Sequence, residues 1–177
     1  MSTFADAFPR DTNRVPFTAY GMLTTTPTTL TGSSATVNVP LWHVTGTVLI
    51  TGLFGVVTTD LGANHTAAAW RINDQTAQVY LTAVGGVDLS GKKAGSLVVK
   101  KGVVATAASA IDNVAGAILE PTTLETMMFS QVMVTKKTGA VTDIEYHYAT
   151  TDAPTSGVIQ HWCYYVPISR DGELTVI

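Results

Sequence analysis

The sequence predicts an all-β protein, because its composition, its hydrophobic pattern and the spacing of its turn residues all favour that fold class. Thr makes up about one residue in six, and charged residues are only 13% of the chain, against about 25% in an average domain. Thr and Val are branched at Cβ, which suits a pleated strand and costs side-chain entropy in a helix. With 177 residues, the chain is long enough for one domain with a sizeable core.

Short apolar runs recur from residue 36 to the end of the chain. The segments between them, such as "NDQ", "SGKKAG" and "TDAPTSG", contain the Gly, Asn, Asp and Pro that form turns. This pattern of about eight short antiparallel strands predicts a β-sandwich or jelly-roll over residues 36–177. The pair 129–137 and 142–149 around "TGA" is the clearest hairpin. We expect strands at 36–44, 46–59, 67–73, 78–84, 95–102, 114–120, 129–137, 142–149 and 157–168.

Residues 1–35 are expected to form an extended N-terminal arm. The segment "TTTPTTLTGSS" is low in complexity and short of large apolar side chains, so it cannot bury much surface. Four aromatic residues precede it among prolines, and an arm of this kind more often docks on its own domain or a neighbouring subunit than stays free. The candidate assembly contacts are Phe4, Phe8, Phe17 and Tyr20.

The most apolar stretch, "GTVLITGLFGVVTT" at 46–59, is read as strand. It is shorter than the roughly 20 apolar residues of a membrane-spanning helix and contains threonines and glycines, so we expect no membrane partner. It also lacks the Lys and the glycine spacing of a phosphate-binding loop. Gly52 and Gly55 are expected to mark a bulge or a close approach of the backbone. Short helices are conceivable only at 104–116, which is rich in Ala, and at 121–129.

Charge and cysteine content narrow the function classes further. A net charge of −3 gives no electrostatic reason to expect nucleic-acid binding, and the three Lys pairs are expected at solvated strand ends. The single cysteine, Cys163, rules out an intrachain disulfide framework and suits a reducing cytoplasm. The N-terminal segment has no apolar run of the kind found in a secretory signal, so we expect a leaderless protein.

Two groups of residues have a spacing that suits chemistry. Asp143, Glu145 and His147 alternate on one strand and would share a face, either as a cation site or, the favoured interpretation, as an ordinary solvated face. His161 and Cys163 also share a face, which allows a thiol nucleophile with a histidine base, although a buried structural cysteine is favoured. The chain contains no G-x-S-x-G, H-E-x-x-H, G-x-G-x-x-G or paired C-x-x-C motif. We therefore expect no enzymatic activity, no cofactor and no bound metal.

Tryptophan and tyrosine residues are concentrated in a few of the expected strands. On exposed strands such side chains bind sugars by stacking, and otherwise they belong to the sandwich core or to a subunit interface. The candidate glycan-binding or interface aromatics are Trp70 and Trp162.

Two segments resemble small virion proteins of tailed bacteriophages. The first is "VTGTVLITGLFGVVTTDLGANHTAAAWRIN", and the second is the C-terminal "SGVIQHWCYYVPISRDGEL" with its Trp, Y-V-P and Gly-containing turn. The resemblance covers about 50 residues of the chain, and it does not extend to the middle. It implies a β-sandwich or jelly-roll module, commonly trimeric, with an extended arm that ties subunits or the capsid surface together.

The resemblance also implies a function and a location. We expect a non-enzymatic capsid decoration or auxiliary protein, located in the virion and assembled in the host bacterial cytoplasm. Its partners would be further copies of itself, with a trimer favoured, and the major capsid protein or another virion protein. The alternative is a tail or fibre-associated protein with a receptor-binding or glycan-binding surface.

Overall fold

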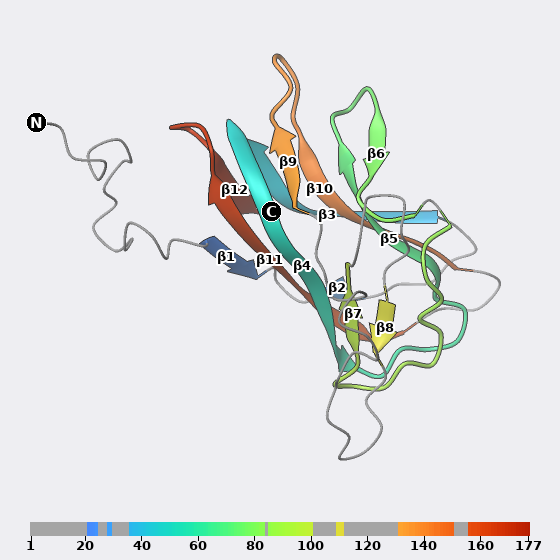
Figure 1. The fold of residues 1–177 in the computed structure, drawn as a ribbon. Helices are drawn as coiled ribbons and strands as arrows, with labels where there is room; N and C mark the ends of the chain where they lie inside the picture. The colour runs from blue at the N-terminus through green and yellow to red at the C-terminus, as the bar shows by residue number, and fades with distance from the viewer. Residues whose placement is uncertain are drawn as a thin grey trace, which may run out of the picture.

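A computed structural model describes residues 21–24, 28–29, 36–83, 85–100, 109–111, 131–150 and 156–177. The described residues form strands and no helix, so the predicted all-β fold class is confirmed (Figure 1). The strands are β1 (Gly21–Thr24), β2 (Thr28–Thr29), β3 (Thr36–Thr45), β4 (Thr47–Thr59), β5 (Thr66–Asn73), β6 (Gln78–Tyr80), β7 (Leu97–Val99), β8 (Ser109–Ile111), β9 (Val132–Thr135), β10 (Asp143–Ala149), β11 (Val158–Pro167) and β12 (Glu173–Val176).

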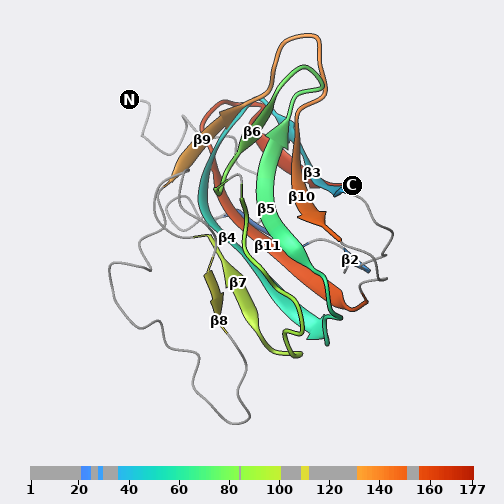
Figure 2. The same cartoon turned by 90° about the vertical axis from the view of Figure 1, so that its right-hand side faces the viewer.

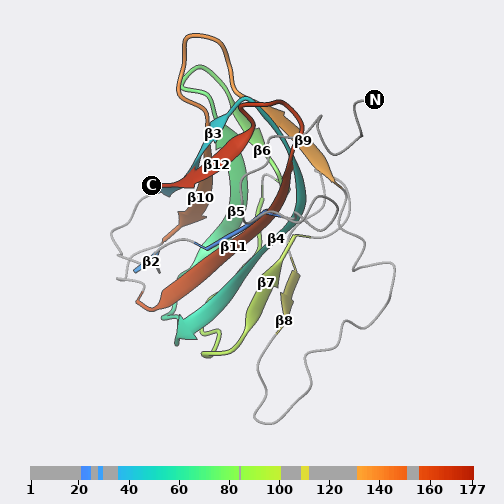
Figure 3. The same ribbon diagram turned by 90° about the vertical axis from the view of Figure 1, so that its left-hand side faces the viewer.

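The strands build two antiparallel sheets. Sheet A has seven strands in the order β1-β11-β4-β7-β8, with β2 also paired to β11 and β9 also paired to β4. Sheet B has five strands in the order β12-β3-β10-β5-β6. Figure 2 shows the long strands β4 and β11 in one layer and β5 and β10 in the other, and Figure 3 shows β12 beside β3 from the opposite side. This arrangement is the predicted β-sandwich.

Alternating side chains from both sheets make the core. On β4 and β11 every second residue is buried over most of the strand, as a period of two residues requires. Those inward side chains face Trp70 of β5 and Ile144, Tyr146 and Tyr148 of β10. Six of the largest core side chains, each at most 1% exposed, are Trp42, Trp70, Tyr146, Tyr148, Ile50 and Ile159.

The glycines of β4 lie where the sequence predicts a bulge or a close approach. The pairing of β4 with β11 skips Thr51, next to Gly52, because Tyr164 pairs with Gly52 and Tyr165 with Ile50. At Gly55, a Cβ atom would lie 2.9 Å from Ile159 and 3.4 Å from the His161 ring. Gly55 therefore leaves room for a histidine ring between the sheets.

The predicted hairpin of 129–137 with 142–149 is wrong. Strand β9 pairs with β4 in sheet A, whereas β10 lies in the middle of sheet B between β3 and β5. The seven residues between β9 and β10 are long enough to cross from one sheet to the other, so the turn residues "TGA" serve a crossover. Lys137 of this crossover forms an ion pair of 3.2 Å with Asp74 in the β5–β6 turn.

Other expected elements are met in part. Eight of the nine expected strands appear, several of them shorter than predicted, while 114–120 lies outside the described residues. Within 104–116 the described residues Ser109–Ile111 form strand β8 and not a helix, and the segment 121–129 is not described. Strands β1 and β2 fall within the predicted arm, and both pair with β11. This portion of the arm is docked on the sandwich.

Candidate functional site

The candidate residues from the sequence fall in three places of the described structure. They are a histidine cluster between the sheets, a polar network on the outside of sheet B, and an aromatic row on the outside of sheet A. The histidine cluster is closed to solvent, and the polar network is hydrogen-bonded within itself. The aromatic row faces outward and carries no charge.

The histidine cluster lies in the core. His65 and His161 are both 0% exposed, and Tyr146 lies in contact range of both, with ring centroids 6.0 Å from His65 and 4.5 Å from His161. The Tyr146 hydroxyl and His65 Nε2 are 2.8 Å apart, and the indole N–H of Trp70 donates to His161 Nδ1 over 3.4 Å. Among the described residues, His65 Nδ1 and His161 Nε2 have no hydrogen-bond partner.

Burial keeps both of these imidazoles neutral. It lowers the pKa of His161 to about 3, helped by the nearby His65, and the pKa of His65 to about 4, against a small opposing effect of Asp88. A charged imidazole would lose its hydration and gain no counter-ion between the sheets. These histidines therefore contribute to packing at neutral pH.

The pairing of His161 with Cys163 does not have the geometry of a nucleophile and its base. Both side chains point into the core and are 0% exposed. Burial raises the pKa of the Cys163 thiol, whereas reactive cysteines have lowered values. The Nδ1 atom of His161 already accepts a hydrogen bond from Trp70. In the described structure a substrate has no access to either side chain.

The outside of sheet B has a polar network centred on Glu145. The Arg71 guanidinium donates to Glu145 Oε2 from Nε over 2.9 Å and lies 2.8 Å from it through Nη2, while Asn73 donates to Oε1 over 2.7 Å. Arg71 also donates to the side-chain carbonyl of Gln78 over 2.8 Å. Arg71 and Glu145 are only 3% and 6% exposed, so the ion pair is buried, and both carboxylate oxygens of Glu145 have a hydrogen-bond donor.

Asp143, Glu145 and His147 do share one face of β10, as predicted, but the favoured solvated face is wrong for two of them. Glu145 and His147 are buried, because strands β3 and β5 flank β10 and supply polar partners. His147 Nδ1 lies 2.7 Å from Asn38 Oδ1, and Asp143 pairs with His43. No group of three or more metal-binding side chains occurs in the described part of the chain.

The outside of sheet A has an apolar surface, named here the apolar face. Register pairs Trp162 with Phe54 across β11 and β4, and the ring of Phe54 stacks on Trp162 and on Tyr164 at centroid distances of 6.1 and 6.0 Å. The same outward side carries Leu49 and Val56 of β4, Leu97 and Val99 of β7, Met133 of β9 and Val166 of β11. All nine are partly or fully exposed, and Met133 reaches 64%.

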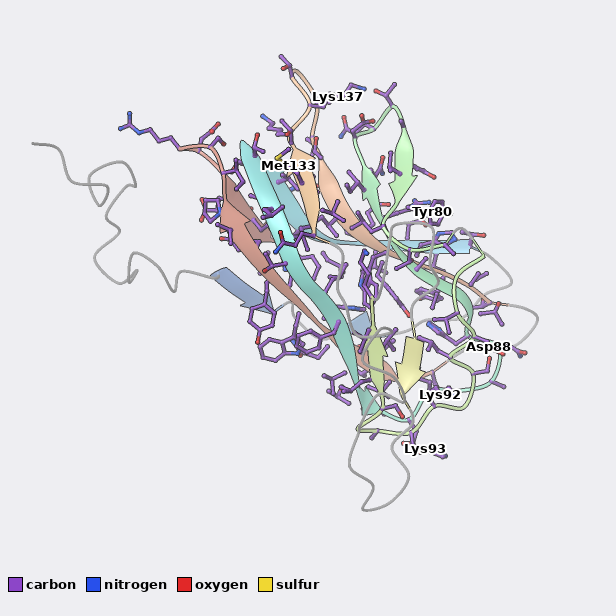
Figure 4. The ribbon with its side chains drawn as sticks, viewed as in Figure 1. Tyr80, Asp88, Lys92, Lys93, Met133 and Lys137 are labelled. Carbon is purple, nitrogen blue, oxygen red and sulfur yellow. The ribbon has the colours of Figure 1, made fainter. Side chains whose placement is uncertain are left out.

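The two outer faces of the sandwich are therefore of opposite character. Outward positions on β4, β7, β9 and β11 hold no charged residue, whereas β5 and β10 present Arg71, Asp143 and Glu145. Figure 4 shows Met133 on β9 of sheet A and Tyr80 on β6 of sheet B. An uncharged aromatic surface of this kind is typical of a protein interaction site.

The predicted aromatic candidates divide between core and surface. Trp162 lies in the apolar face and is partly exposed, whereas Trp70 is 0% exposed and is wrong as a glycan or interface residue. The sequence could not separate them, because both lie in apolar strands and only the sheet pairing decides which side faces out. Phe54, Tyr164 and Met133 are additional surface residues, and the alternation on β4 and β11 was the available signal. Phe4, Phe8, Phe17 and Tyr20 lie outside the described residues.

Comparisons with known proteins identify no relative of this chain. No protein-family model, curated protein or solved structure matches the chain. Among the described residues, no helix is long and apolar enough to span a membrane.

Proposed function

We propose that the protein is a non-enzymatic structural component of a bacteriophage virion, most specifically a capsid decoration or auxiliary protein. It oligomerises through its β-sandwich and attaches to the particle through its N-terminal arm. The apolar face is the observation that supports this proposal, because an uncharged aromatic surface on one side of a β-sandwich favours a protein partner. The likeness of residues 44–73 and 156–174 to small virion proteins supports the phage setting.

The setting is tested by locating the protein in an electron-microscopy map of the intact particle. The expected result is repeated density on the capsid surface that fits the two-sheet sandwich. Absence of the protein from purified particles contradicts the proposal. Density on the tail alone replaces decoration with the second candidate.

The second candidate is a tail or fibre-associated protein that binds a glycan. The row of Phe54, Trp162 and Tyr164 favours it, because aromatic rings on a sheet surface can stack on sugars. Against it, the row is flanked by Leu49, Val56 and Val166, and glycan sites also need polar groups that fix orientation. Glycan-array binding that is lost in Trp162→Ala and retained in Tyr80→Ala, which alters sheet B, would establish this candidate.

The non-enzymatic part of the proposal has its own test at Cys163. We expect an activity-based thiol probe to leave this cysteine unlabelled in the folded protein and to label it after unfolding in urea, since the thiol is buried and its pKa is raised. Mass spectrometry of the intact protein measures the label. Rapid labelling of the folded protein would reopen the hypothesis of a thiol nucleophile with His161.

A further inference from the structure

We propose that the apolar face binds the N-terminal arm of a second copy of this chain. The inference rests on the self-association within the proposed function, and it assigns the arm to a neighbouring copy instead of to the particle. It starts from strand β1, which joins the arm to sheet A. Gly21 pairs with Tyr165 and Thr24 with Trp162, so β1 runs antiparallel to β11 along the border of the apolar face.

At its N-terminal end, β1 points past the end of β11. Its first residue, Gly21, pairs with Tyr165, only two residues before the end of β11 at Pro167. Residues 17–20, "FTAY", contain no turn-forming residue, and the first one upstream is Pro16. At about 3.3 Å per residue, a chain continuing in this direction passes the end of the sheet by roughly 10 Å before Pro16. An arm that keeps this direction meets a neighbouring copy and not its own sheet.

The chemistry of the arm matches that of the face. Residues 1–20 hold Phe4, Phe8, Phe17 and Tyr20, and their two Asp and two Arg residues give no net charge. Aromatic side chains gain both from burial and from offset or edge contacts with other rings, which Phe54, Trp162 and Tyr164 supply. An uncharged aromatic face thus suits an aromatic segment whose side-chain charges balance better than a partner of high net charge.

Symmetry favours an arm over two faces packed together. The contact between the arm of one copy and the face of the next is head-to-tail, so it can close a ring such as a trimer, which a two-fold contact between faces cannot.

The test uses the full-length chain and three variants, with mass measured by light scattering and sedimentation over a range of concentrations. The arm variant replaces Phe4, Phe8, Phe17 and Tyr20 with Ser, and the face variant is Met133→Lys. The matched control is Val79→Lys, which places the same charge at a 54% exposed apolar residue of sheet B. We expect an oligomer for the native chain and the control, and at least tenfold weaker association for the arm and face variants.

A synthetic peptide of residues 1–20 provides a second measurement that does not depend on assembly. It should bind the full-length arm variant, whose face is vacant, and bind at least tenfold more weakly when Met133→Lys is added. An oligomer that persists in the arm variant overturns the inference and leaves self-association intact. Dissociation of the arm variant but not of the face variant also overturns it, because the arm would dock elsewhere.

Two further outcomes are also decisive. A native chain that is monomeric at every concentration overturns both the inference and the self-association in the proposed function. If that monomer binds the peptide only after the arm aromatics are replaced, the arm covers its own face. Location in the virion remains separately testable in the particle map, so failure of the inference and failure of the phage setting are distinguishable.

Discussion

Acid is expected to destabilise the sandwich through its two buried histidines well above the pH at which carboxylates titrate. His65 lies against Tyr146 and Tyr148 of β10, with Asp88 nearby, and His161 lies against Trp70 of β5, Tyr146 and His65. None of these neighbours except Asp88 has a negative charge at neutral pH, and its influence is secondary to burial. Protonating either ring places an unsolvated cation between the sheets.

The sign and size of the effect follow from the pKa values. In the unfolded chain both histidines have their ordinary pKa of 6.5, whereas folding lowers these values to about 4 and about 3. Their contribution is fully present above pH 6.5 and is lost as the pH falls toward the folded values. A pH of 5 lies 1.5 units below the unfolded pKa of each histidine. At 1.36 kcal/mol per unit, the free energy of unfolding therefore falls by about 2 kcal/mol for each histidine and about 4 kcal/mol in total.

Urea unfolding followed by tryptophan fluorescence at pH 7, 6 and 5 measures this loss. The variant His161→Gln should remove about half of the pH dependence, roughly 2 kcal/mol, whatever it does to stability at pH 7. The control Cys163→Ala lies two residues away on the same inward face and has no proton that titrates in this range. It should lower stability and keep the native slope. A His161→Gln slope equal to that of the native chain would refute the reasoning.

Two further substitutions test the outside of sheet B and a strained turn. Glu145→Gln leaves the buried Arg71 guanidinium without its counter-charge, so the free energy of unfolding should fall by about 3 kcal/mol in urea titrations, and an unchanged value would mean that water reaches the pair. Gly86→Ala should lower the thermal midpoint of unfolding more than Gly91→Ala. Both glycines have positive φ, but a Cβ atom at Gly86 would lie 2.2 Å from the carbonyl carbon of Ala67. At Gly91 a Cβ atom would meet nothing within 4 Å. Equal shifts in the two variants would show that backbone conformation alone decides the cost.

The strand content was predictable because it depends on local signals. Residues 158–165 alternate between partly exposed and buried positions, most of these residues are β-branched or aromatic, and turn residues bound the segment on both sides. The partners of a strand depend on distant residues. The sequence of β9, the crossover and β10 is compatible with a hairpin, but β10 has both of its edges occupied by β3 and β5. Pairing between residues 70 to 113 positions apart in the sequence decides that outcome.

The same limit applies to the side on which each aromatic residue lies. Trp70 and Trp162 both lie within expected strands, yet one side chain packs between the sheets and the other lies outside. A local signal was available for polar residues, since Asp143, Glu145 and His147 do share a face. The burial of Glu145 and His147 was not predictable, because it comes from Arg71, Asn73 and Asn38 on the adjacent strands.

The opposite character of the two outer faces determines which side of the sandwich would contact other proteins in an assembly. On sheet B the charges satisfy one another, so this face can remain in water or be covered loosely without leaving a charge unpaired. On sheet A the residues of the apolar face have little to gain from water, and covering them recovers about 25 cal/mol for each Å² of apolar surface buried. In an assembly, a contact with another protein would therefore be most favourable on the side of β4 and β11. Substitutions on that side should alter association, whereas substitutions in the network around Glu145 should alter stability.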